Sequence, residues 1–145
     1  MRRHNGRIVA VQVLYAIDFN RESIENFDKR FDDIQEQLEN EEYQVEIDFV
    51  LAKKLIKGVL KNMSDIDLII NKSIENWTIG ELSYVDRAII RVATYEMKYT
   101  KTPKPVIINE GIEITKAYSN LDNNEQVRFN NRLLDSISKV VYGEC

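Results

Sequence analysis

Apolar residues recur at steps of three and four positions along most of this chain, which is the spacing of one face of an α-helix. Clear examples of such stripes begin at Ile8, Phe49 and Leu82. No stretch shows the two-residue alternation between hairpin turns that is typical of β-strands. The 145 residues include only 5 Gly and 2 Pro, so few positions interrupt a helix. The pattern predicts an all-α protein with about six to seven helices packed in one or two bundles.

Residues with strong capping preferences help to bound the predicted helices. Ser64 predicts a helix start, because its short side chain can accept hydrogen bonds from free backbone amides. Pro105 suits the first position of a helix, and Gly143 predicts the end of the last one. We expect helices over residues 8–19, 45–62, 64–74, 81–99, 106–118 and 127–141, with a weaker one within 20–43.

Two residue counts exclude most catalytic and metal chemistry. The only cysteine is Cys145, so an internal disulfide or a cysteine-based zinc site is excluded. The only histidine is His4, which we expect in a loose N-terminus, where it could not serve a catalytic triad. The chain also lacks a Gly-rich phosphate loop and a G-x-S-x-G motif. We therefore expect neither an enzyme nor a metal or cofactor site.

No apolar run approaches the ~20 residues that a membrane span needs. The first 20 residues also lack the pattern of a signal peptide. We therefore expect a cytoplasmic protein without a membrane partner.

The net charge of −4 conceals an uneven distribution along the chain. Residues 1–15 contain three arginines and no acid, whereas residues 16–50 contain 12 acids and only 3 bases. Residues 51–145 are nearly balanced, with 14 bases and 12 acids. The basic start could therefore contact an anion such as RNA phosphate. The acidic segment is either a solvated helical face or a surface for a protein partner.

Four short motifs carry the clearest functional signal. Residues 7–15 read R-x-x-A-x-Q-x-L-Y, and residues 85–96 contain Val-Asp-Arg-Ala, an arginine and Tyr-Glu in that order. Residues 106–110 read Val-x-Ile-Asn-Glu, and residues 129–135 contain Phe-x-Asn followed by Leu-Asp. In this order and register the motifs resemble the NusB transcription antitermination family. The resemblance covers residues 2–18 and about 77–137, while the acidic middle fits only by length and helicity.

The resemblance implies a small, all-helical bacterial protein with a single domain over residues 1–145. It further implies two helical subdomains, which we place at about 1–63 and 64–145. Such a protein binds the boxA element of nascent RNA jointly with the small-ribosomal-subunit protein NusE. The pair joins the RNA polymerase antitermination complex and supports rRNA transcription, without catalysis or a cofactor. The sequence leaves open whether the protein is a monomer or a homodimer.

The resemblance also implies roles for individual residues. The positions assigned to RNA are Arg2, Arg3, Arg7, Gln12, Arg91, Tyr118, Arg128 and Phe129. For Arg91, an internal ion pair is the alternative. Tyr15 and Asp86 are assigned to the contact with NusE. The family usually reads Phe-Val-Asn-Gly where this chain has Arg132 at the fourth position, which indicates a different close contact or one more cation toward RNA.

Two other functions fit parts of the sequence. One is a helical protein-interaction adaptor without an RNA role, which would use the acidic segment 16–50. The other is the RNA-binding module found at the front of some RNA cytosine methyltransferases, which would make this chain a fragment of a longer protein. Reversing basic charges near the N-terminus separates RNA binding from the adaptor function, because only RNA binding needs those charges.

Overall fold

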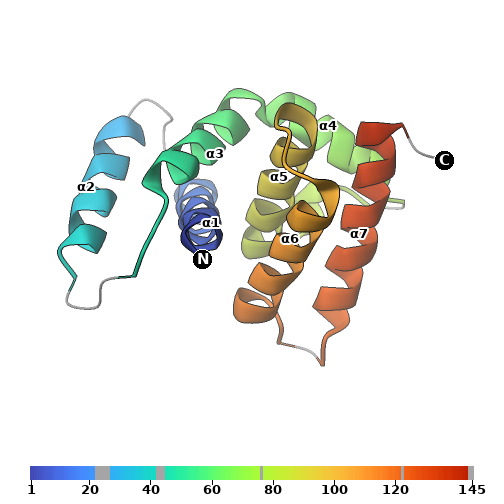
Figure 1. Ribbon diagram of the computed structural model, residues 1–145. Helices are drawn as coiled ribbons and strands as arrows, with labels where there is room; N and C mark the ends of the chain where they lie inside the picture. The colour runs from blue at the N-terminus through green and yellow to red at the C-terminus, as the bar shows by residue number, and fades with distance from the viewer. Residues whose placement is uncertain (22–26, 42–44, 76, 122, 144–145) are drawn as a thin grey trace.

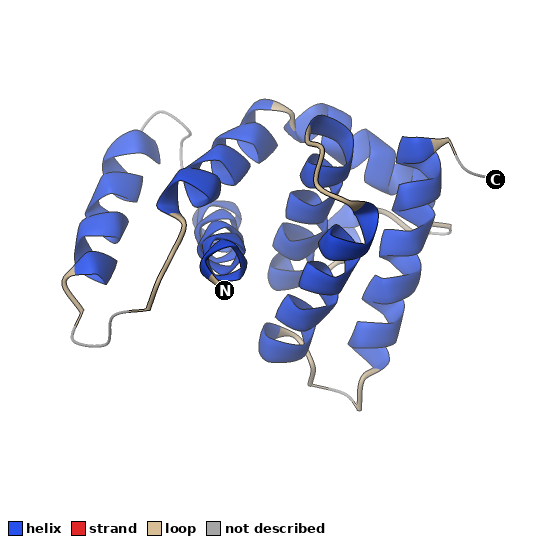
Figure 2. Cartoon of the chain, viewed as in Figure 1, coloured by secondary structure: helices blue, strands red, loops and turns tan. Residues whose placement is uncertain are grey.

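The structure is a computed structural model that describes residues 1–21, 27–41, 45–75, 77–121 and 123–143. These residues form seven α-helices and a short 3-10 helix, and none of them is in a strand (Figure 2). The helices are α1 (Arg2–Asn20), α2 (Phe27–Glu39), α3 (Phe49–Lys61), α4 (Met63–Ser73), α5 (Tyr84–Tyr99), α6 (Lys104–Tyr118) and α7 (Glu125–Tyr142), with the 3-10 helix η2 (Ile79–Glu81) before α5. The prediction of an all-α fold with about six to seven helices is confirmed.

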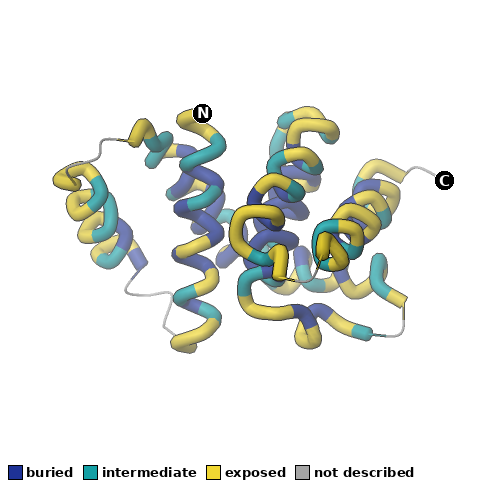
Figure 3. Tube along the Cα trace, turned by 90° about the horizontal axis from the view of Figure 1, so that it is seen from below, coloured by how far each residue is buried: buried dark blue, intermediate teal, exposed yellow. Residues whose placement is uncertain are grey.

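Helix α1 lies at the centre of the arrangement. Figure 1 shows it end-on below α3, with α2 on one side and the bundle that contains α5, α6 and α7 on the other. It packs against both α3 and α5, and its inward residues are buried in the core. Figure 3 shows buried turns along this helix where it faces its neighbours. The division into subdomains 1–63 and 64–145 stays a prediction. Helix α1 packs against α3, which lies in the first range, and against α5, which lies in the second.

The N-terminus is helical from Arg2 onward, whereas the sequence predicted a loose arm before the first helix. Tertiary contacts hold this end. The backbone N–H of Asp48 donates to the carbonyl of Arg2 (3.1 Å), and His4 Nδ1 hydrogen-bonds to the carboxylate of Glu110 on α6. Patterns within one segment could not reveal these contacts, because they join residues far apart in the sequence.

Helix α3 begins later than the predicted range 45–62, at Phe49. The carboxylate of Asp48 accepts a hydrogen bond from the backbone N–H of Leu51 (2.9 Å) and so caps the helix. At the other end of the chain, Gly143 has a φ of 70° and closes α7 in the left-handed conformation. The predicted stop at this glycine is confirmed.

The predicted cap at Ser64 is wrong. Helix α4 begins at Met63, with only Asn62 between it and the end of α3, and the N–H of Ile66 donates to the carbonyl of Asn62 (2.9 Å). The two helices therefore join at a single-residue corner, which needs no separate capping segment. A smaller correction concerns Pro105, which occupies the second position of α6 rather than the first.

Helices α3 and α5 approach each other closely at Gly58. A Cβ atom at this position would lie 2.1 Å from Cε1 of Tyr95, so any side chain would displace the ring. Tyr95 has little room to move, because it is 8% exposed and stacks on Tyr99 with 5.3 Å between ring centroids. This contact explains a glycine inside a helix, where it costs about 1 kcal/mol relative to alanine.

Candidate nucleic-acid interface

Arg7 lies inside the protein, although the sequence predicted that it faces RNA. Its side chain is 3% exposed, and Nε and Nη2 each donate to a carboxylate oxygen of Glu96 on α5 at 2.9 Å. Nη1 lies 3.6 Å from Oε1 of Glu110 on α6. Burial alone would lower the pKa of Arg7, but the hydrogen bonds and charge of Glu96 raise it, so the guanidinium stays charged. In this position Arg7 ties α1 to α5 and α6 and presents almost no surface to RNA.

Arg91 forms an internal ion pair, which the sequence left open as the alternative to RNA binding. Its Nε and Nη2 donate to the two carboxylate oxygens of Asp67 on α4, both at 2.9 Å. Nη1 also donates to Asp18 on α1 at 3.4 Å, and Arg87 shares that carboxylate at 3.1 Å. These charges join α1, α4 and α5, so Arg91 is placed as a structural residue rather than an RNA ligand.

Asp86 is buried at the start of α5, with 3% of its surface exposed. Its carboxylate accepts hydrogen bonds from Ser83 Oγ (2.6 Å), Ser119 Oγ (2.8 Å) and Asn130 Nδ2 (2.9 Å). Three donors and its burial leave this carboxylate little capacity to contact a partner directly. The residue holds together the start of α5, the end of α6 and the start of α7.

Several of the predicted RNA residues do lie on the surface near α1. Arg2 and Arg3 are exposed in its first turn, and Gln12 is exposed further along the same helix. Gln12 and Tyr118 line one hollow of about 370 Å³ together with Asn5. Tyr118 ends α6 and is 46% exposed. The structure thus brings the amides of Asn5 and Gln12 and the ring of Tyr118 to one hollow beside α1.

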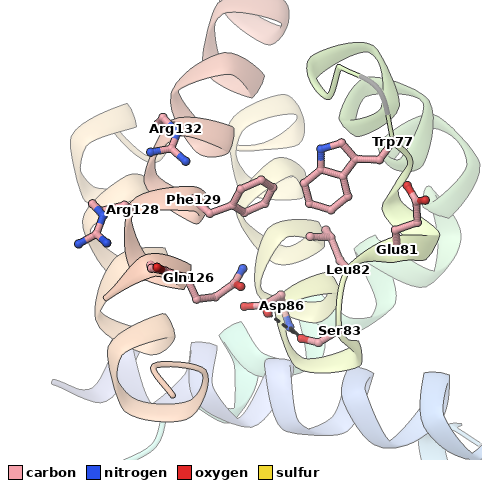
Figure 4. Close-up of a pocket in the computed structure, with 10 residues that line it drawn as sticks. Trp77, Glu81, Leu82, Ser83, Asp86, Gln126, Arg128, Phe129 and Arg132 are labelled. Atoms are coloured by element: carbon pink, nitrogen blue, oxygen red, sulfur yellow. Dashed lines mark hydrogen bonds between the residues drawn. The ribbon is translucent and has the colours of Figure 1, made fainter. Parts of the chain in front are cut away.

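Arg128 and Phe129 line a second hollow, of about 510 Å³, at the start of α7 (Figure 4). Trp77 and Arg132 also line it. The rings of Phe129 and Trp77 are in contact, with 4.6 Å between their centroids and 40° between their planes. The two hollows share no lining residue, although Ser119, the neighbour of Tyr118, donates to Asp86 at the second one.

Tyr15 belongs to an exposed cluster of three aromatic rings, which we call the aromatic surface. Tyr15 stacks on Phe19 at 5.8 Å between centroids, and Phe19 meets Tyr84 edge to face at 5.5 Å. The three rings are 37%, 57% and 37% exposed, and the guanidinium of Arg87 lies over Tyr84 at 4.8 Å. Phe19 and Tyr84 were not predicted as partner residues. The spacing of four between Tyr15 and Phe19 was the available signal, since it places both rings on one helix face.

A sequence model of the NusB family matches residues 4–139, which is most of the chain. The chain belongs to the NusB family. The transcription antitermination protein NusB of Clostridium botulinum (strain Loch Maree / Type A3) is 39% identical over 127 residues, covering 82% of this chain and 89% of that protein. The protein of the same name from Helicobacter hepaticus (strain ATCC 51449 / 3B1) is 34% identical over 137 residues, covering 94% of this chain and 82% of the other.

Solved structures show the same fold as this NusB-family chain. T. maritima NusB superposes with a TM-score of 0.74 at 33% sequence identity, covering 96% of this chain and 92% of the other. The solution structure of NusB from Aquifex aeolicus gives 0.74 at 26% identity, with 99% and 92% covered. A chain in the crystal structure of a plectonemic RNA supercoil gives 0.79 at 26% identity, with both chains fully covered. The predicted NusB-like fold is confirmed.

Among the residues described for this NusB-family chain, no group of three His, Cys, Asp or Glu side chains could hold a metal ion. No helix in the described ranges is both long and apolar enough to cross a membrane. The two hollows and the aromatic surface include guanidiniums, amides and aromatic rings, beside aliphatic side chains in the first hollow and acids in both hollows. These groups suit recognition of a flexible, charged polymer and of a protein surface.

Proposed function

We propose that this chain is a transcription antitermination factor that binds boxA-type nascent RNA together with the ribosomal protein NusE. Membership of the NusB family supports this function, as do relatives named transcription antitermination protein NusB. The observation that carries it is the exposure of Arg2 and Arg3 at the start of α1, with Gln12 of the same helix and Tyr118 at one hollow. Arginines bind phosphates, while aromatic rings and amides recognise unpaired bases. Such a factor acts on RNA polymerase during rRNA synthesis, in the cytoplasm.

The proposed RNA face consists of exposed or half-exposed side chains from α1, α6 and α7. Its members are Arg2, Arg3, Gln12, Tyr118, Arg128 and Phe129. Arg7 supports this face from inside, because its ion pair with Glu96 fixes the basic end of α1 against α5. Three exposed arginines give a modest salt dependence, about 0.7 per phosphate contacted in single strands. Affinity for RNA alone is then limited, which is why a protein partner that also contacts RNA is part of the proposal.

We place NusE at the aromatic surface formed by Tyr15, Phe19 and Tyr84. Exposed aromatic rings are enriched in protein interfaces and often supply much of their binding energy. The base of this surface is rigid, because Arg87 contacts Tyr84 and is paired with Asp18. Asp86 contributes indirectly, since it holds the start of α5 from which Tyr84 projects.

Co-purification tests the joint binding. The immobilised chain should retain purified NusE more strongly with boxA RNA than with a scrambled RNA of the same composition. Phe19→Ala should reduce retention by about tenfold or more, the scale of an aromatic hot spot. Val50→Ala is the control, because it truncates an exposed apolar side chain on a different helix, α3. It should leave retention unchanged. Equal retention with both RNAs, together with an unaffected Phe19→Ala variant, would reject NusE as the partner at this surface.

The alternative function, a protein-interaction adaptor that uses the acidic segment 16–50, has less support than RNA binding. Asp28 on α2 lies 3.0 Å from Nζ of Lys57 and 3.6 Å from Nζ of Lys53, both on α3. The hydrogen bond to Lys57 holds the pKa of Asp28 below its usual value. Part of the acidic charge therefore attaches α2 to α3, which is a structural role.

A further inference from the structure

We infer that His4 and Glu110 are positioning residues for RNA binding: their contact holds the basic first turn of α1 against α6, and a proton on His4 strengthens it. The inference rests on the proposed function, because Arg2 and Arg3 in this turn belong to the proposed RNA face. It assigns no RNA contact to His4 or Glu110. RNA affinity should therefore increase as the pH falls through the range in which histidine gains a proton.

The first turn of α1 is weak in its local properties. The side chain of its N-cap residue, Met1, accepts no hydrogen bond from the free backbone amides, and the turn contains no acid. Arg2 and Arg3 place two positive charges at the positive end of the helix dipole, where cations are unfavourable. Contacts with other segments must therefore keep this turn helical and hold the two arginines in place.

Three hydrogen bonds described for this turn join it to other segments. Two go to the segment before α3, where a backbone N–H donates to the carbonyl of Arg2 (3.1 Å) and a backbone carbonyl accepts from Nδ2 of Asn5 (2.8 Å). Neither of these bonds involves an ionisable side chain. The third joins Nδ1 of His4 to Oε2 of Glu110 on α6. Of the three, this bond is the one that a change of pH near neutrality can strengthen or weaken.

The charges beside His4 leave one carboxylate without a close positive partner. Glu96 on α5 accepts two hydrogen bonds from Arg7, both at 2.9 Å. Oε1 of Glu110 lies further from the same guanidinium, 3.6 Å from Nη1. The side chain of Glu110 is 19% exposed, so water screens its charge only in part. A proton on His4 places a positive charge at Oε2 of Glu110, and the two carboxylates are then matched by two cations.

Charged groups on α1 and on the segment before α3 also act on His4. Arg3 precedes it in the same turn and adds positive charge. In the segment before α3, Glu46 is exposed, and Asp48 is engaged as the cap of α3. A positive charge on His4 is therefore favoured by Glu110 and opposed by Arg3 and the helix dipole. Protonation should strengthen the first turn only while Glu110 is charged, and it should weaken the turn when that charge is removed.

Nuclear magnetic resonance of the full chain without RNA tests the contact itself. His4 is the only histidine, so its single Hε1 resonance reports its protonation directly. The N–H of Asn5 donates to the carbonyl of Met1 (3.0 Å), so its hydrogen-exchange protection factor reports on the helical first turn. Between about pH 7 and about pH 5.5, this factor should rise about threefold in the wild type, within the range of one ion pair. In Glu110→Gln it should stay level or fall.

Filter binding of boxA RNA at the same two pH values and ~0.1 M salt tests the consequence for RNA. Wild-type affinity should be about threefold higher at the lower pH, since other side chains and amino termini ordinarily change charge outside this window. His4→Gln and Glu110→Gln should both lose this pH dependence. Glu113→Gln is the matched control, because it removes a carboxylate from the same helix that is paired with Lys116 instead of His4. It should keep the pH dependence.

The outcomes separate this inference from the proposed function. A pH dependence of RNA affinity that persists in Glu110→Gln means that His4 binds RNA directly, which overturns the positioning role. RNA binding that is independent of pH in the wild type, or a protection factor of Asn5 that is, overturns the inference and leaves the proposed function intact. Absence of RNA binding at both pH values overturns both. If circular dichroism shows that Glu110→Gln is unfolded, His4→Gln decides, since its protection factor in the absence of RNA should not change with pH.

Discussion

Glu96→Ala is expected to lower the free energy of unfolding by about 3–5 kcal/mol, the cost of leaving a buried charge without its partner. The Arg7 guanidinium is 3% exposed and would retain only the carboxylate of Glu110, at 3.6 Å. Because α1 packs against both α3 and α5, loss of this pair should loosen the centre of the molecule. Urea unfolding followed by circular dichroism measures the change.

Two control variants separate the buried pair from charge effects in general. Asp135→Ala breaks the exposed pair between Lys139 and Asp135 (3.4 Å) and should cost no more than about 1 kcal/mol. The double variant Arg7→Met/Glu96→Leu should recover most of the lost stability, because apolar side chains replace both charges. If Glu96→Ala costs no more than Asp135→Ala, the pair does not hold α1 as described.

Charge reversal at the start of α1 is expected to abolish most RNA binding. In Arg2→Glu/Arg3→Glu, the loss of two single-strand phosphate contacts should weaken binding by at least about 25-fold at ~0.1 M salt. The salt slope should fall by about 1.4 for the same reason. Both side chains are exposed, so the fold should survive. Filter binding of boxA RNA over a series of salt concentrations measures both quantities.

The control for this variant is Lys54→Glu/Lys61→Glu, which makes the same charge change at two exposed positions on α3. It should reduce affinity far less. Arg7 is left unchanged in both variants, because reversing it would break the buried pair with Glu96 and confuse folding with binding. Unchanged RNA affinity in Arg2→Glu/Arg3→Glu would remove α1 from the RNA face and favour the adaptor function.

The fold could be predicted where local signals decide it. The apolar stripe after Leu82 and the stop at Gly143 indicated α5 and the end of α7, because both depend on neighbouring residues. The start of α1 and the corner at Asn62 could not be predicted in this way. The first depends on contacts with α6 and with the segment before α3, and the second on the direct joining of two helices.

The candidate site was predictable only in part, because residue type does not reveal which way a side chain faces. The exposed positions of Arg2 and Tyr118 agree with the predicted interface. Arg7 has the same side chain as Arg2, yet its partner Glu96 lies 89 positions away and holds it inside the protein. Asp86 is similar, since Asn130, 44 positions away, occupies its carboxylate.

The most direct measurement of the central claim is filter binding of the wild-type chain to boxA RNA and to scrambled RNA, each with and without NusE. We expect boxA RNA to bind more tightly than scrambled RNA, and the difference to increase when NusE is present. Equal binding of both RNAs under both conditions would contradict the proposed function.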